Sequence, residues 1–503
     1  MRKSEDVENS GRSVRNSPAS ASTSPQPLRS EWNDPEETAM HFFQTKTIPE
    51  ISGYFETTFW SSLVKETSQY DPAVRHAAIA LGSLHEAFKS GDIRAPSVHN
   101  PNSKKQFALQ QKIKAIRHLN DHISAAGGNQ SPEVILIACL LLICLEIMQG
   151  NYQAAFTHLE SGLKIMSDWL PRDGQPARMG GPMSQTNRKV IEEDLVPIFA
   201  RLDVQASTFL TSRSDHYDLL SRHGQTNSQN LQYGAPPPVP DSFWSLHEAR
   251  KSLDQQAQWM VFYGKAMADR RYSPSNNIGG LESWDGLLQI LVDGQRESAF
   301  RLQCWSNAFH AFLQENDNGR GLQGKEFCGA TTLNLNYFTS RLLLDTATLG
   351  DELGFDRFRA EFEIITSLAE NIMRSLPPVP DPDMRNAPNF QLDTAIIPSL
   401  YFVVCKCRDP SIRRRAIALL SASPRQEGVW ESRYIASIGQ WIMKKEEEGL
   451  GGLMTAHEIP ESSRVAIIEK TVMAGKKCLL KYHHGVRSTP GGTLKIEEHT
   501  ISW

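Results

Sequence analysis

The sequence has 503 residues, of which 40% are hydrophobic and 22% charged, and its formal net charge is -4. This composition is typical of a globular protein with one large core or two ordinary ones, and it argues against a chain that binds nucleic acid through bulk positive charge. The seven cysteines are odd in number and scattered, often inside apolar runs, which favours reduced core residues over a disulfide scaffold.

The first 34 residues contain eight serines, three prolines and no hydrophobic periodicity. Such a segment cannot bury enough apolar surface to offset the entropy lost on ordering, so we expect it to be disordered. No apolar stretch follows its basic residues, so we predict no secretory signal. Ordered structure is expected to begin near Pro35, with a short helix around residues 54–63.

The first strong helix pattern covers residues 71–86, where Asp71 can cap the helix. Apolar side chains recur at spacings of three and four residues, which places one stripe against a core. The side chains of Arg75, Ser83 and Glu86 are expected to point away from that stripe. The pattern therefore predicts an amphipathic helix over residues 71–86.

An unbroken apolar run, Val134–Leu145, predicts a helix that is buried on every side. Its length is well short of the roughly 20 residues needed to cross a bilayer, so we interpret it as a core helix and expect a soluble protein. Gly150 ends it, and a second helix follows over residues 152–166. The two segments predict an antiparallel helix pair.

Further helical patterns bring the expected number of helices above ten. No repeat of 20 to 50 residues is visible, which disfavours a regular solenoid. Two surface loops are expected at residues 171–186 and 221–241, the second ending in a proline-rich run that is a plausible docking edge. The further helices are expected at residues 103–123, 194–210, 244–271, 281–313, 331–349, 355–376, 396–406, 410–422 and 430–448.

The predicted fold class is all-α, an irregular array of helix hairpins with a disordered N-terminus and a small C-terminal β-hairpin. The hairpin is expected from two strand-like segments, 464–472 and 477–482. The predicted organisation is a disordered segment over residues 1–34, an all-α domain over 35–450 and a tail over 451–503.

Four blocks of the sequence resemble, in order, the fungal-specific transcription factor regulatory domain, also called the middle homology region. The similarity runs from about residue 55 to about residue 445. It implies a nuclear regulator of transcription, of the kind often associated with secondary-metabolite gene clusters, whose domain normally follows a six-cysteine zinc cluster that binds DNA. The blocks are Asp71–Glu86, Gly150–Met166, Ile198–Gln205 and Cys407–Ile417.

The zinc cluster implied by this resemblance requires six cysteines within about thirty residues, because two zinc ions share thiolate ligands. Residues 1–138 contain no cysteine, so we expect that this sequence cannot form the cluster. Two explanations stay open: the protein works without its own DNA-binding module, or Met1 is not the true start.

Patterns that point to enzyme chemistry are weak. The sequence Gly319–Gly324 fits the dinucleotide-binding pattern, but it follows a polar turn instead of a strand. His118 and His122 lie four residues apart on a predicted helix without a third metal ligand in view. No nucleophile elbow and no phosphate-binding loop is present. We therefore predict no catalytic residue, no metal site, no cofactor and no enzyme activity.

The sharpest charge cluster consists of Arg408, Arg413, Arg414 and Arg415, on or beside the helix that begins at Pro410. One interpretation is a patch that binds phosphate or a partner. The favoured interpretation is a solvated helix face with acidic intramolecular partners, because four charges alone cannot give strong affinity for nucleic acid.

The predicted function is a fungal-type transcriptional regulator that acts through its helical regulatory domain. Expected partners are proteins of the transcription machinery or a DNA-binding partner, and DNA only indirectly or through a missing N-terminal module; no membrane is expected, and a homo-oligomer stays open. The alternative is a helical scaffold that kept the fold and lost the role in transcription.

Overall fold

The computed structural model leaves the predicted disordered segment largely outside what it describes, together with residues 170–184 and 210–237, which cover most of both predicted surface loops. For residues 185–186, 261–272 and 284–291 it describes the backbone alone. The described residues are 33–55, 58–90, 103–124, 131–169, 185–209, 238–272, 284–316, 321–347, 349–376, 388–452, 455–473, 475–485 and 495–503.

The N-terminal half is helical throughout its described part. Helix α1 begins at Asp34, where the Asn33 side chain accepts a hydrogen bond from the backbone N of Glu36 at 2.9 Å. The elements are α1 (Asp34–Phe42), η1 (Phe43–Thr47), α2 (Ile48–Ile51), η2 (Phe59–Leu63), α3 (Val64–Tyr70), α4 (Pro72–Ser90), α5 (Lys104–Ser124), α6 (Pro132–Met148), α7 (Tyr152–Trp169), α8 (Gln185–Val190), η3 (Ile191–Leu195) and α9 (Val196–Phe209).

The C-terminal half adds further helices and two small sheets. They are α11 (Leu246–Tyr272), α12 (Trp284–Glu315), α13 (Gly324–Thr346), η4 (Leu353–Phe358), α14 (Arg359–Ser375), β1 (Asn389–Gln391), α15 (Ile397–Lys406), α16 (Pro410–Ala422), β2 (Arg425–Glu427), β3 (Trp430–Glu431), α17 (Ser432–Glu446), η6 (Ala456–Glu458), η7 (Glu461–Ser463), β4 (Val465–Met473), β5 (Lys477–His484) and β6 (Glu497–Ser502).

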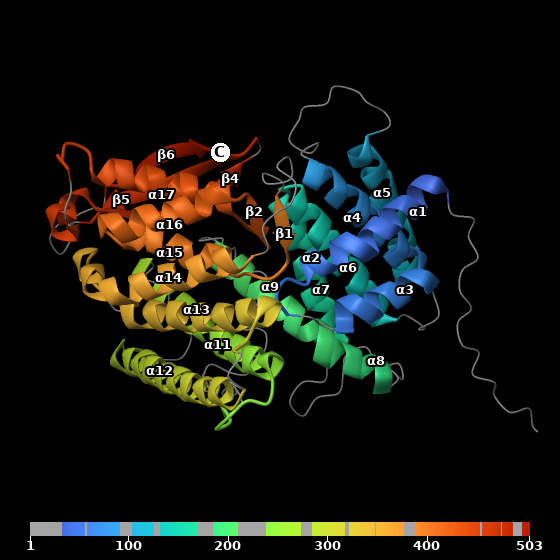
Figure 1. Ribbon diagram of the computed structural model, residues 1–503, viewed down its shortest axis with the longest axis horizontal. Coiled ribbons are helices and arrows are strands. Elements are labelled where there is room, and N and C mark those ends of the chain that lie inside the picture. Colours follow the sequence, from blue (N-terminus) through green and yellow to red (C-terminus); the bar gives the residue numbers. More distant parts are fainter. Residues whose placement is uncertain are drawn as a thin grey trace, which may run out of the picture.

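The arrangement confirms the predicted all-α class with more than ten helices and a small C-terminal sheet. Figure 1 shows α1 to α8 gathered on one side of the molecule, and α11 to α17 with the C-terminal sheet on the other. Helix α9 lies between them and contacts both α7 and α11. The two sides are therefore joined through a helix that packs on each of them.

Helix α4 lies among other helices of the N-terminal side, because α1, α3, α5 and α6 all contact it. The prediction that Arg75 and Ser83 point away from the core is wrong, since both side chains are buried. The Arg75 guanidinium donates to the Ser68 and Gln69 carbonyls at 3.1 and 2.6 Å, and Ser83 Oγ donates to the Lys104 carbonyl at 2.9 Å. These bonds satisfy polar groups that the packing places inside.

Helix α6 confirms the prediction of a helix buried on all sides, since every residue from Ile135 to Met148 is buried. Its hairpin with α7 turns at Gly150, whose φ of 74° lies in the left-handed region that glycine adopts without strain. The antiparallel pair predicted from the sequence is therefore present.

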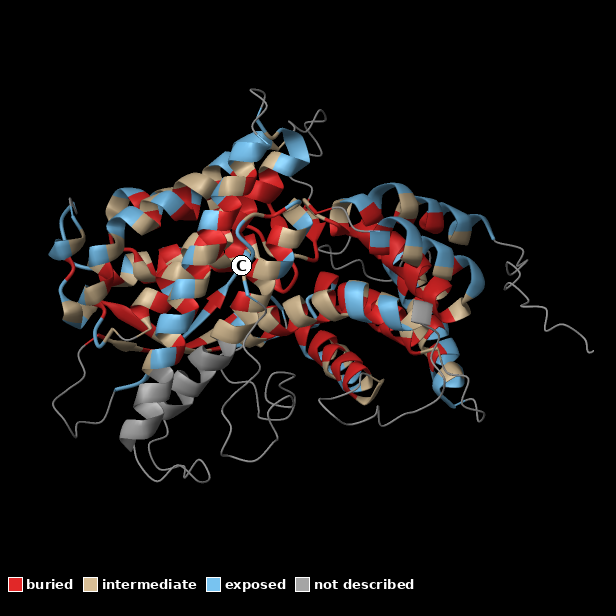
Figure 2. Cartoon of the chain, turned by 90° about the horizontal axis from the view of Figure 1, so that it is seen from below, coloured by how far each residue is buried: buried red, intermediate tan, exposed pale blue. Residues whose placement is uncertain are grey.

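The buried side chains form two clusters. The larger one extends from α1 to the C-terminal sheet and includes α6, α15 and α17. The smaller one lies between α11, α12 and α13 around Trp305, whose indole N donates to the Ala249 carbonyl at 2.8 Å. Figure 2 shows buried residues on the inward sides of the helices and exposed residues on their outward sides.

The C-terminal tail contains the predicted hairpin, with β4 and β5 antiparallel, and also a third strand, β6, that the sequence analysis did not predict. The sheet packs against α17 through β4 and β6. The ring of Trp503 lies 4.5 Å from that of Tyr434, and its indole N donates to Glu431 at 2.8 Å. Contacts with residues distant in sequence therefore hold β6 in place, although most of its own residues are polar.

Several predicted boundaries are wrong; the helix predicted over residues 331–349, for example, covers Gly324–Thr346. Two further helices begin elsewhere for an identifiable reason. The helix predicted over residues 430–448 begins at Ser432, because Trp430 and Glu431 form β3 in a small sheet with β1 and β2. The helix predicted over residues 194–210 belongs to a longer helical stretch that begins at Gln185. In the first case, residues 430–431 pair with a distant segment of the chain. In the second, the helix continues across a stretch whose hydrophobic pattern is weak.

Candidate functional site

The four arginines of the predicted cluster lie around the end of α17. Arg408, in the short link between α15 and α16, and Arg413, on α16, both reach the Glu446 carboxylate and have 1% and 0% exposed surface. Arg408 Nη2 lies 2.8 Å from Glu446 Oε1, and Arg408 Nη1 lies 2.9 Å from Glu352 Oε2. The centre of the cluster is therefore a buried ion-pair network.

Glu446 is the shared acceptor of this network. Besides the two guanidinium groups, its carboxylate accepts a hydrogen bond from the backbone N of Val465 at 2.8 Å, which ties the start of β4 to α17. Burial alone would raise the pKa of Glu446, but the charges of Arg408 and Arg413 lower it below its usual value. The carboxylate is thus held ionised inside the protein.

The other two arginines lie nearer the surface and are also paired. Arg414 Nη2 lies 2.6 Å from Glu447. Arg415 contacts Glu363 and Glu370 of α14 at 2.6 and 3.1 Å. Each guanidinium is therefore bound to a carboxylate of the same chain.

A phosphate-binding patch built from all four arginines is wrong for Arg408 and Arg413, because a phosphate cannot reach a side chain without exposed surface. For Arg414 and Arg415 such a patch stays a prediction. Intramolecular acidic partners, the favoured interpretation, are present for all four, although two of the arginines are buried and not solvated.

A further arginine, Arg464, which the sequence analysis missed, lies beside this network. It has no exposed surface and forms a bidentate pair with Asp356 of η4, at 2.8 and 2.7 Å. It also donates to the Glu352 and Ile459 carbonyls at 3.0 Å each. Its partner lies 108 residues earlier in the chain, so no local pattern could have found the pair.

A third network, of buried and half-buried charges, ties α9, the helix between the two sides, to the C-terminal side of the molecule. Arg201 of α9 and Arg250 of α11 both pair with Asp393, which precedes α15, at 2.8 and 2.5 Å. Arg201 also lies 3.3 Å from Asp254. Burial would raise the pKa of Asp393, but the two guanidinium charges lower it to about 2.

Lys470 of β4 is the one buried lysine in the described part of the chain. Its ammonium lies 4.2 Å from the centre of the Tyr401 ring, 5.1 Å from that of Trp430 and 5.6 Å from that of Phe209. Burial lowers the pKa of Lys470 to about 8. The aromatic rings partly replace the carboxylate that a buried ammonium normally requires.

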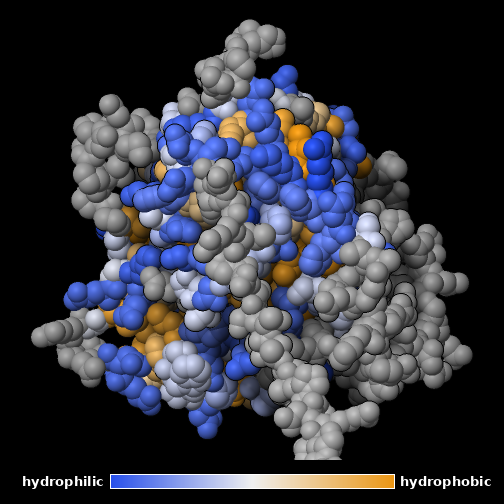
Figure 3. All heavy atoms as spheres, turned by 90° about the vertical axis from the view of Figure 1, so that its right-hand side faces the viewer, coloured by the Kyte–Doolittle hydropathy of each residue, from blue (hydrophilic) through white to orange (hydrophobic). Residues whose placement is uncertain are grey.

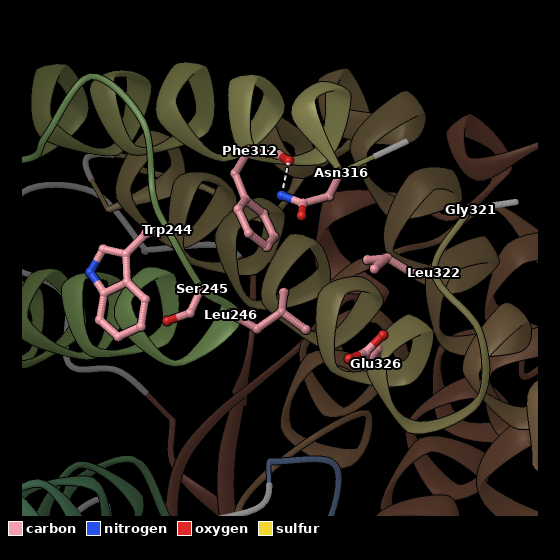
Figure 4. Close-up of a pocket in the computed structure, with 8 residues that line it drawn as sticks. All are labelled: Trp244, Ser245, Leu246, Phe312, Asn316, Gly321, Leu322 and Glu326. Carbon is pink, nitrogen blue, oxygen red and sulfur yellow. Dashed lines mark hydrogen bonds between the residues drawn. The ribbon is translucent and has the colours of Figure 1, made fainter. Parts of the chain in front are cut away.

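A pocket lies where α11 begins, α12 ends and α13 begins (Figure 4). It has a volume of about 780 Å³, within the range typical of small-molecule sites. Three of its lining side chains, Leu246, Phe312 and Leu322, come from three different segments and point toward its centre. The sequence analysis predicted no site there.

The remaining predicted candidates do not form a site. Of the Gly319–Gly324 pattern, residues 319–320 lie outside the described part, and the described elements on either side of it are the helices α12 and α13. The His118 ring stacks on that of His76, and His122 lies 3.9 Å from Asp71. Among the residues described, no group of three His, Cys, Asp or Glu side chains is placed to hold a metal ion.

The surface carries scattered apolar residues. Figure 3 shows the side of the molecule where α1, α3 and α5 lie, on which hydrophilic residues predominate and apolar ones form small separate groups. On α5 the exposed apolar residues are Leu109, Ile113 and Ile123. Within the described residues, no helix combines the length and the apolar character needed to cross a membrane.

Comparison with known proteins identifies a domain and two relatives. Residues 39–284 match the family described as the fungal specific transcription factor domain. The chain is 24% identical over 508 residues, 85% of this chain and 77% of the relative, to the aspercryptin biosynthesis cluster-specific transcription regulator atnN of Emericella nidulans. It is 29% identical over 205 residues, 39% of this chain and 48% of the relative, to the transcription regulator lscL of Purpureocillium lilacinum. No solved structure matches.

Proposed function

From the premise that this chain carries a fungal specific transcription factor domain, we propose that it regulates the transcription of a secondary-metabolite gene cluster. The match over residues 39–284 carries the proposal, because it spans the helices from α1 to α11 that build most of the larger core. The similarity to a cluster-specific regulator extends beyond that domain to 85% of the chain. The protein is a transcriptional regulator of the fungal type.

The helical body, which we place at residues 35–450, acts by binding proteins of the transcription machinery and works in the nucleus. The charges of the arginine cluster support indirect contact with DNA, since Arg408 and Arg413 are buried and Arg414 and Arg415 already hold carboxylates. Sequence-specific DNA contacts then come from a partner or from a separate zinc-cluster module. Regulation by binding, without catalysis, agrees with the family.

The direct test tethers the full chain to an unrelated sequence-specific DNA-binding domain, upstream of a reporter gene. We expect the tethered chain to change the reporter transcript relative to the DNA-binding domain alone, because the regulatory surface would then act at a promoter. An unchanged reporter, with the fusion present in the nucleus at equal abundance, would contradict the proposal.

A second experiment addresses the target genes. Deletion of the gene in its native fungus should change the transcripts of one contiguous group of biosynthetic genes, while transcripts elsewhere stay constant. A fluorescent fusion should accumulate in the nucleus. Exclusion from the nucleus together with unchanged transcripts would favour the alternative, a helical scaffold outside transcription.

A further inference from the structure

Helix α5 carries two stripes of residues along its length. The first is buried inside the N-terminal side, where α4 and α6 contact the helix, and it consists of Ala108, Gln111, Ala115 and Leu119. The second lies about 100° further round the helix, because Leu109, Ile116 and Asn120 each directly follow a residue of the first. It consists of Gln106, Leu109, Ile113, Ile116, Asn120 and Ile123, and each of these residues is exposed or half-buried.

Exposed apolar residues concentrate on the second stripe. Leu109, Ile113 and Ile123 expose 49%, 44% and 44% of their surface, and no other helix in the described part of the chain has more than one exposed large hydrophobic residue. The spacing of the stripe alternates between three and four residues, which is the seven-residue repeat by which one helix packs along another in a coiled coil. In this repeat Ile113 and Asn120 occupy position a, and Leu109 and Ile116 occupy position d. The second stripe therefore fits a further helix that packs along α5.

The polar residues of the second stripe identify that helix. Asn120 lies at position a, where a polar side chain covered by a facing helix requires a hydrogen-bonding partner on that helix. A second copy of α5 that runs parallel and in register supplies this partner, because every residue of the stripe then faces its own counterpart. The Asn120 amides of the two copies face each other, and Leu109 and Ile113 face leucine and isoleucine. The second stripe is therefore self-complementary in the parallel arrangement.

An antiparallel pair is less favourable. If its apolar residues are to meet, it places Asn120 against Leu109 of the second copy, so two amides per dimer are covered without a partner, and each weakens association about tenfold. The parallel pair brings Lys112 near Arg117 of the second copy, but Lys112 already pairs with Glu146. Repulsion between partly exposed charges weakens association by about fivefold at most. The hydrogen bonds of Asn120 therefore favour the parallel arrangement.

We propose that the second stripe of α5 is a dimerisation surface, which packs along the same stripe of a second copy of this chain in parallel about a two-fold axis. One pair of helices is a small interface compared with the roughly 800 Å² per partner of a standard complex, so we expect a dissociation constant in the micromolar range. The inference concerns association of the chain with itself, so it goes beyond the proposed function.

Sedimentation velocity of the full chain over a range of concentrations tests the surface. We expect a monomer–dimer equilibrium in the natural protein and association of I113E that is weaker by about a hundredfold, because each dimer would then cover two carboxylates. L343E is the matched control, since Leu343 of α13 exposes the same 44% of its surface and lies outside the stripe. It should leave the equilibrium unchanged, and circular dichroism should show that both variants are folded. A natural protein that stays monomeric well above micromolar concentration, unchanged association of I113E, or an equal loss in L343E would each overturn the proposal.

Disulfide crosslinking tests the parallel register. In N120C the two introduced thiols face each other, so mild oxidation should give a covalent dimer, whereas an antiparallel pair would hold them about 16 Å apart along the helices. The natural protein gives the background, because all its cysteines except the half-buried Cys304 are buried, and L343C should not exceed that background. No covalent dimer of N120C, or equal crosslinking of L343C, would overturn the proposed arrangement. Both experiments measure self-association alone, so their failure would leave the transcriptional role standing.

Discussion

At the scale of single residues, the buried charges determine much of the chemistry of this protein. Glu446 holds two guanidinium groups in an interior where neither reaches water. A buried carboxylate that balances two cations cannot be removed without leaving uncompensated charge, which is far more unfavourable than the loss of an exposed ion pair. Lys470 presents the opposite case, a buried cation whose described neighbours are aromatic rings and thiols.

We expect E446Q to lower the free energy of unfolding by about 3–5 kcal/mol at pH 7, because Arg408 and Arg413 would stay buried without a counter-charge. Urea unfolding followed by circular dichroism measures the change. E448Q, two residues further along, is the control, since the Glu448 side chain is 74% exposed, and it should change stability by less than about 0.5 kcal/mol. Equal stability of the two variants would show that Glu446 is not the anchor of the network.

We expect K470M to raise the stability of the protein by about 2–3 kcal/mol at pH 7, slightly below the full value of the pKa shift because the cation–π contacts are also lost. An amine whose pKa falls on folding destabilises the folded state while it is protonated. This penalty is complete below pH 8 and fades as the pH rises toward 10.5, the ordinary pKa of lysine.

The stability gained by K470M should therefore shrink as the pH is raised from 8 to 10, as measured by urea unfolding midpoints at several pH values. K477M, on the same sheet, is the control, because the Lys477 side chain is exposed. A variant less stable than the natural protein at every pH would mean that the aromatic rings stabilise the ammonium more than burial destabilises it.

At the scale of elements, close helix contacts depend on small residues. Gly162 of α7 faces Phe199 of α9, and a Cβ atom placed on Gly162 would lie 2.2 Å from Cε1 of that ring. Phe199 is fully buried, so its ring has little room to move. The packing of α7 on α9 therefore requires glycine at this position.

We expect G162A to lower the free energy of unfolding by about 1–3 kcal/mol through overpacking. The double variant G162A/F199L should be more stable than the two separate changes predict when added, with a coupling of about 1 kcal/mol, because the smaller leucine makes room for the methyl group. S161A is the control on the exposed face of α7. Additive effects in the double variant would contradict the contact.

At the scale of the whole molecule, charge as well as apolar packing ties α9, the helix between the two sides, to the C-terminal side. Asp393 joins α9 and α11 to the segment before α15 through Arg201 and Arg250. Its pKa is lowered from 3.8 to about 2, so the stability it supplies is complete above pH 3.8 and lost as the pH falls through about 2. At neutral pH the connection is fully formed.

We expect D393N to lower the free energy of unfolding by about 2–3 kcal/mol at neutral pH, because the buried Arg250 and the half-buried Arg201 lose one carboxylate partner and keep only Asp254. Hydrogen exchange followed by mass spectrometry should show faster exchange both in α11 and at the start of α15. D121N, at an exposed aspartate of α5, should leave both segments unchanged. Faster exchange confined to one segment would show that Asp393 does not connect the two.

The sequence by itself determined the class of fold and most of the helices. Residues 71–86 and 134–145 carry a helical pattern in their own composition, because a period of three to four residues or a fully apolar run reports burial locally. The hairpin of β4 and β5 was also predicted from the sequence. The resemblance to the fungal specific transcription factor domain was also recognisable from short blocks, and residues 39–284 match that family.

The tertiary structure alone decided which charges are buried and what they hold. Glu446 lies 38 residues from Arg408, and Asp393 lies 192 residues from Arg201. Ion pairs over such separations leave no periodic signal, so the sequence analysis placed the arginines on a solvated face. The aromatic cage of Lys470, the strand β6 and the pocket beside Trp244 have the same origin, because each is formed where segments distant in the chain come together in space.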